Sequence, residues 1–152
     1  MLSHLPHRFG GEMEITCLSL ISMRSTDMSV NQGIVDFTSK ATSLTVTRSA
    51  TGLLVTSINV EGSSKAYGPF VGTVTVTGSN KGGTWRYEAF ALPADGSNLT
   101  GSAQGSYEAV SGGRWKTLGV GAVMSDSAVQ NLRLEAEFDL ENHTWNGKLV
   151  PI

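Results

Sequence analysis

Four aromatic side chains are the residues of this 152-residue chain best suited to bind a small molecule. Trp85 and Tyr87 are two positions apart, so in a β-strand they project from the same face. Tyr107 and Trp115 flank the turn at 111–113, and we expect them on adjoining strands. If these faces point into a cavity, the rings would line it for a flat apolar or lactone-like ligand, with phenol and indole groups offering hydrogen bonds. The alternative interpretation is ordinary core packing.

Three glutamates and one histidine are weaker polar candidates for a site. Glu135 and Glu137 share one face of a strand, as a general acid–base pair or a set of oxygen ligands for a metal would require. Glu88 lies on a second polar face with Arg86. Such spacing is also typical of the solvent-facing side of an antiparallel sheet, and this is the interpretation we adopt. His143 adjoins a turn, and a single imidazole makes neither a metal site nor a catalytic triad, so we predict no metal and no cofactor.

Charge and cysteine content argue against several classes of protein. The formal net charge is −2, and the 11 basic residues are scattered along the chain. Nucleic-acid binding needs clustered Lys and Arg, so we expect neither a nucleic-acid nor a membrane partner. Cys17 is the single cysteine, which excludes an internal disulfide and a cysteine metal cluster. No apolar run approaches the roughly 20 residues of a transmembrane helix.

The first 27 residues differ from the rest because they show no strand alternation. Their apolar run ITCLSLISM is interrupted by Ser and Thr, and no clean cleavage site follows it, so a signal peptide fits poorly. We predict an irregular N-terminal extension over 1–27, a single domain over 28–152, and a cytoplasmic protein. If residues 1–27 act as a signal, the protein is secreted instead.

Beyond residue 31 the apolar residues recur with a period of two, which predicts strands rather than helices. Short connections make neighbours in sequence neighbours in the sheet, giving eight or nine antiparallel strands. The expected ranges are Gly33–Ser39, Thr42–Arg48, Gly52–Glu61, Phe70–Thr77, 84–92, Leu99–Glu108, Trp115–Met124, Gln130–Leu140 and His143–Leu149.

Glycines inside these strands favour a closed sheet. Five of them are Gly72, Gly101, Gly105, Gly119 and Gly121, and glycine in a strand marks a bend or a close backbone approach. Closure also removes the exposed edges that so many Val- and Thr-rich strands would otherwise present. We predict an all-β fold, a single antiparallel up-and-down β-barrel of about eight strands. A two-sheet sandwich is the alternative, because its strands alternate in the same way.

Two glycine-rich segments read EGSSKAYGPFVGTVTV and DGSNLTGSAQGSYEAVSGGRWKTLGVGA. They resemble bacterial β-barrel proteins grouped with allene oxide cyclase and dirigent proteins, and the resemblance covers roughly Gly62–Met124. It implies an eight-stranded barrel with an apolar lumen, assembled as a homo-oligomer (dimer or trimer). The chain departs from the family pattern at Lys65–Tyr67, which lacks the usual histidine. The shared motifs are turn and bend residues, so they indicate architecture and not activity.

Three functions remain open at this level, and whether the chain is an enzyme is left undecided. The preferred one is binding of a small apolar molecule in the barrel lumen. The first alternative is a cofactor-free isomerase or cyclase acting on a small hydrophobic substrate, and the second is a structural oligomerisation domain. A buried carboxylate in the lumen would favour the enzyme. A dry cavity without ionisable groups would favour the binding protein, and a lumen filled by side chains would favour the structural domain.

Overall fold

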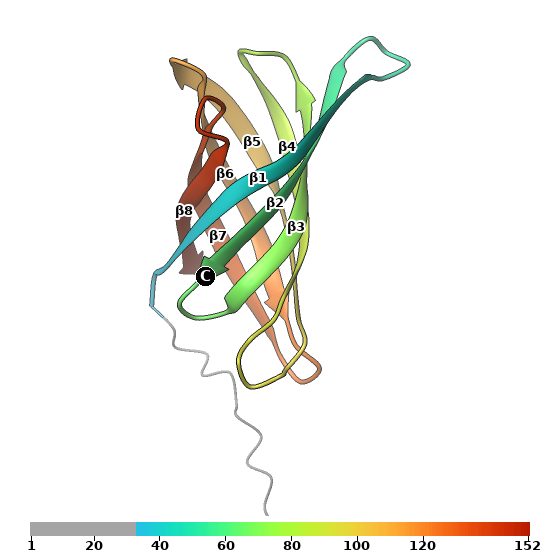
Figure 1. Ribbon diagram of the computed structural model, residues 1–152. Helices are drawn as coiled ribbons and strands as arrows, with labels where there is room; N and C mark the ends of the chain where they lie inside the picture. Colours follow the sequence, from blue (N-terminus) through green and yellow to red (C-terminus); the bar gives the residue numbers. More distant parts are fainter. Residues whose placement is uncertain (1–32) are drawn as a thin grey trace, which may run out of the picture.

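Eight antiparallel strands make up residues 33–152, which are the residues that the computed structural model describes. Each strand pairs with the next, and β8 pairs with β1, so the sheet closes into a barrel (Figure 1). The strands are β1 (Val35–Arg48), β2 (Leu54–Ser64), β3 (Gly68–Gly78), β4 (Gly82–Ala91), β5 (Leu99–Ser111), β6 (Arg114–Met124), β7 (Val129–Asp139) and β8 (Thr144–Pro151).

This closure confirms the predicted all-β barrel of eight strands. The ladder between β1 and β8 runs from Val35↔Leu149 to Lys40↔Thr144, so the sandwich alternative is wrong. The predicted boundary between residues 27 and 28 lies outside the described residues. In the part of the chain that the structure describes, there is no helix that is long and apolar enough to cross a membrane.

The two ranges expected at 33–39 and 42–48 are one strand. β1 pairs with β2 from Phe37 to Arg48, with a register shift between Ala41 and Ser43. Thr42 is the extra residue of this bulge, and its hydroxyl donates to the carbonyl of Asn59 over 3.3 Å. A bulge bends a strand and increases its twist without ending it, which explains why the sequence pattern breaks here while the strand continues.

The five strand glycines shape the inner face of the wall. Cross-strand pairing places each of them on the same side as buried residues, for example Gly72 opposite Val60 and Gly119 opposite Leu134. A Cβ atom on Gly119 would lie 2.5 Å from Cζ2 of Trp85 and would also run into the carbonyl oxygen of Gln104. The close coiling of the wall therefore requires glycine at this position, as expected for a small barrel.

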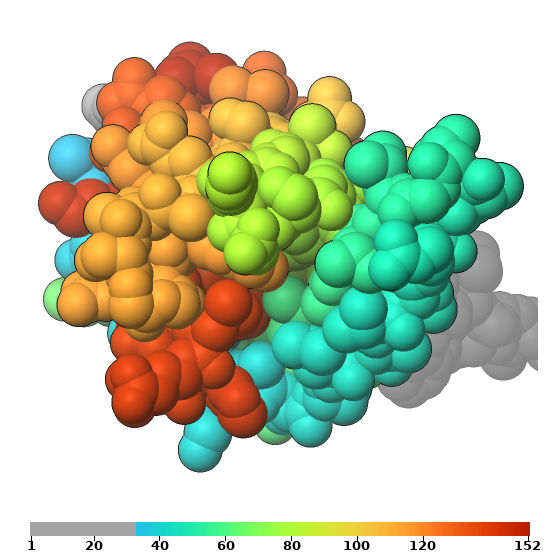
Figure 2. All heavy atoms as spheres, turned by 90° about the horizontal axis from the view of Figure 1, so that it is seen from above, coloured from blue at the N-terminus to red at the C-terminus, as the bar shows by residue number. Residues whose placement is uncertain are grey.

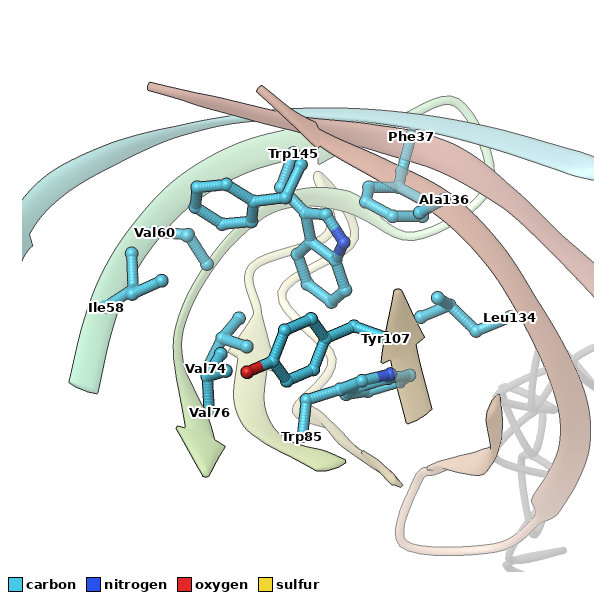
Figure 3. Close-up of a cluster of buried hydrophobic side chains, with 11 residues drawn as sticks. Phe37, Ile58, Val60, Val74, Val76, Trp85, Tyr107, Leu134, Ala136 and Trp145 are labelled. Carbon is cyan, nitrogen blue, oxygen red and sulfur yellow. The ribbon is translucent and has the colours of Figure 1, made fainter. Parts of the chain in front are cut away.

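Trp145 lies at the centre of the main core and organises the aromatic packing (Figure 3). Its ring meets those of Phe37, Trp85 and Tyr87 edge to face, with centroid distances of 5.3, 5.8 and 5.1 Å. Its indole N–H donates to Oγ1 of Thr117 over 3.1 Å, so the polar atom of this buried ring is satisfied. The middle of the lumen is thus filled by side chains.

The two ends of the barrel differ. At the upper end, the β1–β2 hairpin extends past the other strands, and its Leu44 and Val46 side chains are half exposed. Seen from above, the upper hairpins gather around the end of the barrel (Figure 2). At the lower end, the turn between β2 and β3 places Tyr67 across the opening, where it is buried with Val35 and Leu99. The upper end therefore carries half-exposed apolar side chains, whereas those at the lower end are buried.

Candidate functional site

A cavity of about 70 Å³ lies in the lower half of the barrel, and we call it the lower cavity. It separates the main core from the small cluster around Tyr67. Side chains of the main core that line it are Phe37, Phe70, Tyr87, Leu134 and Trp145, and those on the lower side are Tyr67, Ala91, Leu99, Val123 and Leu149. The cavity is thus a gap between two separately packed groups of side chains.

The small size of the inward-facing residues at one level of the wall leaves this space open. Gly101 of β5 stands between Ala89 of β4 and Val123 of β6. A Cβ atom on Gly101 would approach nothing closer than the carbonyl oxygen of Ala122, at 3.9 Å. A second void of about 50 Å³ adjoins the same glycine. No large ring covers Gly101 as Trp85 covers Gly119, so the space stays empty.

The lining is apolar, and its ionisable groups are two tyrosines, Tyr67 and Tyr87. Burial raises the pKa of both phenols, so both are protonated at neutral pH. Within residues 33–152, no carboxylate, imidazole or ammonium group lines the cavity. The cavity can therefore hold an apolar molecule and donate a hydrogen bond, but its lining offers no strong base.

A tyrosine and a glutamine close the lower end. The Tyr67 hydroxyl donates to Oε1 of Gln130 over 2.7 Å, and the Tyr67 amide N–H donates to Oγ of Ser64 over 3.0 Å. Gln130 has the same orientation in β7 as the buried Leu132 and Leu134, so it points inward. Its Nε2 is buried and has no hydrogen-bond partner among the described residues. A buried amide donor without an acceptor is rare in folded proteins.

The four predicted aromatic residues all project into the lumen, but they do not surround one cavity. Only Tyr87 lines the lower cavity. Trp85 packs against Trp145 and donates its indole N–H to the carbonyl of Ser106 over 2.9 Å. The rings of Tyr107 and Trp115 pack together in the upper half, with centroids 4.7 Å apart.

The weaker polar candidates lie outside the lumen. Glu88 pairs with Arg86, Glu135 with Arg133 and Glu137 with Arg114, at N–O distances of 2.7, 2.9 and 3.5 Å. All six side chains are 44% exposed or more, so these ion pairs contribute little to stability.

His143 lies in the exposed turn between β7 and β8, with a φ of 56°. Its carbonyl accepts a hydrogen bond from the Ala41 amide over 2.7 Å. Among residues 33–152, no three His, Cys, Asp or Glu side chains lie close enough together to hold a metal ion.

Two residues that line the lower cavity, Trp145 and Tyr67, and the neighbouring Gln130 were missed at the sequence level. Trp145 precedes Gly147 and Leu149 with period two, so alternation alone would have placed it inside. Gln130 alternates with Leu132 and Leu134 in β7, so the same alternation would have predicted a polar side chain on the inner face. Tyr67 lies in a turn, and no periodic pattern indicates whether a turn residue folds over the barrel or away from it.

Comparisons of this chain with models of protein families, with curated proteins and with solved structures find no match. The resemblance to allene oxide cyclase-like and dirigent-like barrels therefore stays a prediction. The barrel itself follows from the strand pairing and does not depend on that resemblance.

Proposed function

We propose that this protein binds a small apolar molecule in the lower cavity. The observation that supports this most directly is an apolar space inside the barrel, lined by Gly101 and the Tyr87 and Trp145 rings. Apolar cavities of this kind stay dry and take up apolar molecules. The Tyr67 hydroxyl already donates to Gln130, which leaves the Tyr87 hydroxyl as the phenol that can donate a hydrogen bond to a ligand.

The size of the lower cavity limits the ligand. An apolar cavity of about 150 Å³ holds a benzene molecule, and the lower cavity measures about 70 Å³. A ligand with one six-membered ring therefore needs some extra room, from the adjoining void or from movement of a lining side chain. We expect ligands of one ring or a short branched chain, and not the drug-sized molecules that fill pockets of roughly 300–1,000 Å³.

The isomerase or cyclase alternative has less support. Proton transfer at neutral pH needs a group whose pKa lies near that pH. The carboxylates and the imidazole considered as candidates, Glu88, Glu135, Glu137 and His143, lie on the outer surface. The cavity phenols have pKa values raised by burial, which makes them donors and not bases.

The structural-domain alternative is favoured by one observation, the densely filled upper half of the lumen. The rings of Tyr107 and Trp115 pack against each other there, and Trp85 packs against Trp145. The homo-oligomer that the family resemblance implies stays a prediction. Sedimentation or native mass spectrometry measures it directly, independently of ligand binding.

The test of the proposed function is an NMR titration of the full chain with methylenecyclohexane. We expect saturable shifts confined to amides around the lower cavity, such as those of Gly101, Val123 and Leu149. Gly101→Val fills the cavity and should weaken binding at least tenfold. Gln104→Val places the same side chain on the outer face of the same strand, and should leave the affinity unchanged. Absence of saturable shifts, or equal affinity in the folded Gly101→Val protein, would refute the proposal.

A further inference from the structure

Gln130 has a hydrogen-bonding capacity that the folded chain leaves unused. Its Oε1 accepts the Tyr67 hydroxyl, whereas its Nε2 is buried and has no acceptor among residues 33–152. An amide that loses its hydrogen bonds to water without gaining others destabilises the fold. The position of this amide on the inner face of β7 therefore calls for a partner that is not part of the described chain.

Gln130 does not itself line the lower cavity, but it contacts two residues that do. Gln130 is paired across the sheet with Val123, which lines the cavity, and it is hydrogen-bonded to Tyr67, which lines it as well. The Tyr67 side chain thus lies between the cavity and the lower end of the barrel.

We propose that the ligand is an apolar molecule with one hydrogen-bond acceptor, such as a ketone, ester or lactone oxygen, that pairs with Nε2 of Gln130. This inference rests on the proposed function and names the class of ligand. Binding displaces the Tyr67 ring far enough to admit the acceptor. The apolar body of the ligand then occupies the lower cavity against Tyr87 and Trp145, and its oxygen points towards β7.

Two ring molecules of nearly equal shape test this inference. Cyclohexanone carries a carbonyl oxygen where methylenecyclohexane carries a CH₂ group, so the ratio of their dissociation constants isolates the acceptor. The ratio is measured by NMR titration on the full-length protein and on Gln130→Met, which keeps the length of the side chain and removes its donor. We expect the preference for cyclohexanone to fall by about five- to tenfold in Gln130→Met, the contribution of one neutral hydrogen bond.

Two matched variants separate the donor from a general loosening of the lower end. Tyr67→Phe breaks the same Tyr67–Gln130 hydrogen bond but keeps the amide donor, so it should retain the preference for cyclohexanone. Gln104→Met makes the same substitution on the exposed outer face of β5 and should behave like the unmodified protein. Folding of each variant is checked from its amide spectrum before titration.

The outcomes distinguish this inference from the proposed function. If methylenecyclohexane binds but the ratio is the same in Gln130→Met, the donor has no part in recognition, as when a bound water alone satisfies the amide. The inference then fails and the proposed function stands. If Tyr67→Phe loses the preference for cyclohexanone as Gln130→Met does, the loss comes from a general loosening of the lower end and not from the amide donor. That result would also overturn the inference. If neither molecule binds, both proposals fail.

Discussion

Alanine substitutions at Gly119 and Gly101 should change stability in opposite directions. Both glycines face the lumen from strand interiors, and the two substitutions add the same methyl group. The surroundings differ: at Gly119 the new Cβ would collide with the Gln104 carbonyl and lie 2.5 Å from the Trp85 ring. At Gly101 the nearest atom is 3.9 Å away. The comparison therefore isolates the space that the barrel leaves at each position.

The expected magnitudes follow from packing and chain entropy. Overpacking a core costs about 1–3 kcal/mol, and a clash with backbone lies towards the upper end because the wall must move. Replacing glycine in a strand recovers about 0.5–1 kcal/mol of chain entropy at either site. At Gly101 the methyl also fills part of a void of about 70 Å³, and burying it gains roughly 0.8 kcal/mol. We expect Gly119→Ala to lose about 2 kcal/mol and Gly101→Ala to gain about 1.5 kcal/mol.

Equilibrium unfolding in urea, followed by tryptophan fluorescence, measures both changes. The three tryptophans of the chain, Trp85, Trp115 and Trp145, all belong to the lumen and report on its packing. With a slope of about 1–3 kcal/mol per molar urea, the two variants should differ in midpoint by at least about 1 M. Equal midpoints would refute the packing argument, since they would mean that the wall relaxes freely at Gly119 or that the space at Gly101 is already filled.

Three further predictions concern the tyrosines and the buried indole. Tyr107→Phe removes a 2.6 Å hydrogen bond to the Ser79 carbonyl and should lower the unfolding free energy by about 1 kcal/mol. Because the Tyr107 ring lies in the upper half of the barrel, the ligand affinity measured by NMR should not change. Thr117→Val leaves the Trp145 indole N–H without its acceptor and should cost about 1–3 kcal/mol in urea unfolding, whereas Thr117→Ser, which keeps the hydroxyl, should cost less. Burial raises the pKa of Tyr87. The stability that its neutral phenol contributes is therefore complete below the unfolded-state pKa of about 10 and falls as the pH rises above it. In urea unfolding measured from pH 8 to 11, Tyr87→Phe should reduce this fall in the midpoint.

Alternation in the sequence was sufficient to predict the barrel wall. In β4, Trp85, Tyr87 and Ala89 alternate with Arg86 and Glu88, and the structure places the first three inside and the other two outside. The strand period of two is a local property, so it can be read from one segment at a time. Closure was predicted from glycines within strands, because only a tightly coiled sheet needs them at so many positions.

The position of the cavity could not be predicted in the same way. Gly101 and Gly119 look alike in the sequence, since each is a glycine in an alternating strand. What separates them is the side chains on nearby strands: Trp85 of β4 reaches over Gly105 to Gly119, whereas Ala89 and Val123 flank Gly101 and leave it uncovered. That distinction depends on which residues become neighbours across the closed sheet, and therefore on the register of several strands together.

The same difference explains why the lower half of the barrel is the place for a ligand. Where a large ring meets a glycine, as at Trp85 and Gly119, the ring occupies the space that the glycine leaves. Where glycine meets only small side chains, as at Gly101, the fold keeps a void of about 70 Å³. By the cavity cost of about 24 cal/mol per Å³, this void destabilises the fold by nearly 2 kcal/mol. A bound apolar molecule offsets that cost by filling the void, and an acceptor on the ligand would also satisfy Nε2 of Gln130, so one ligand would relieve both defects of the lower end.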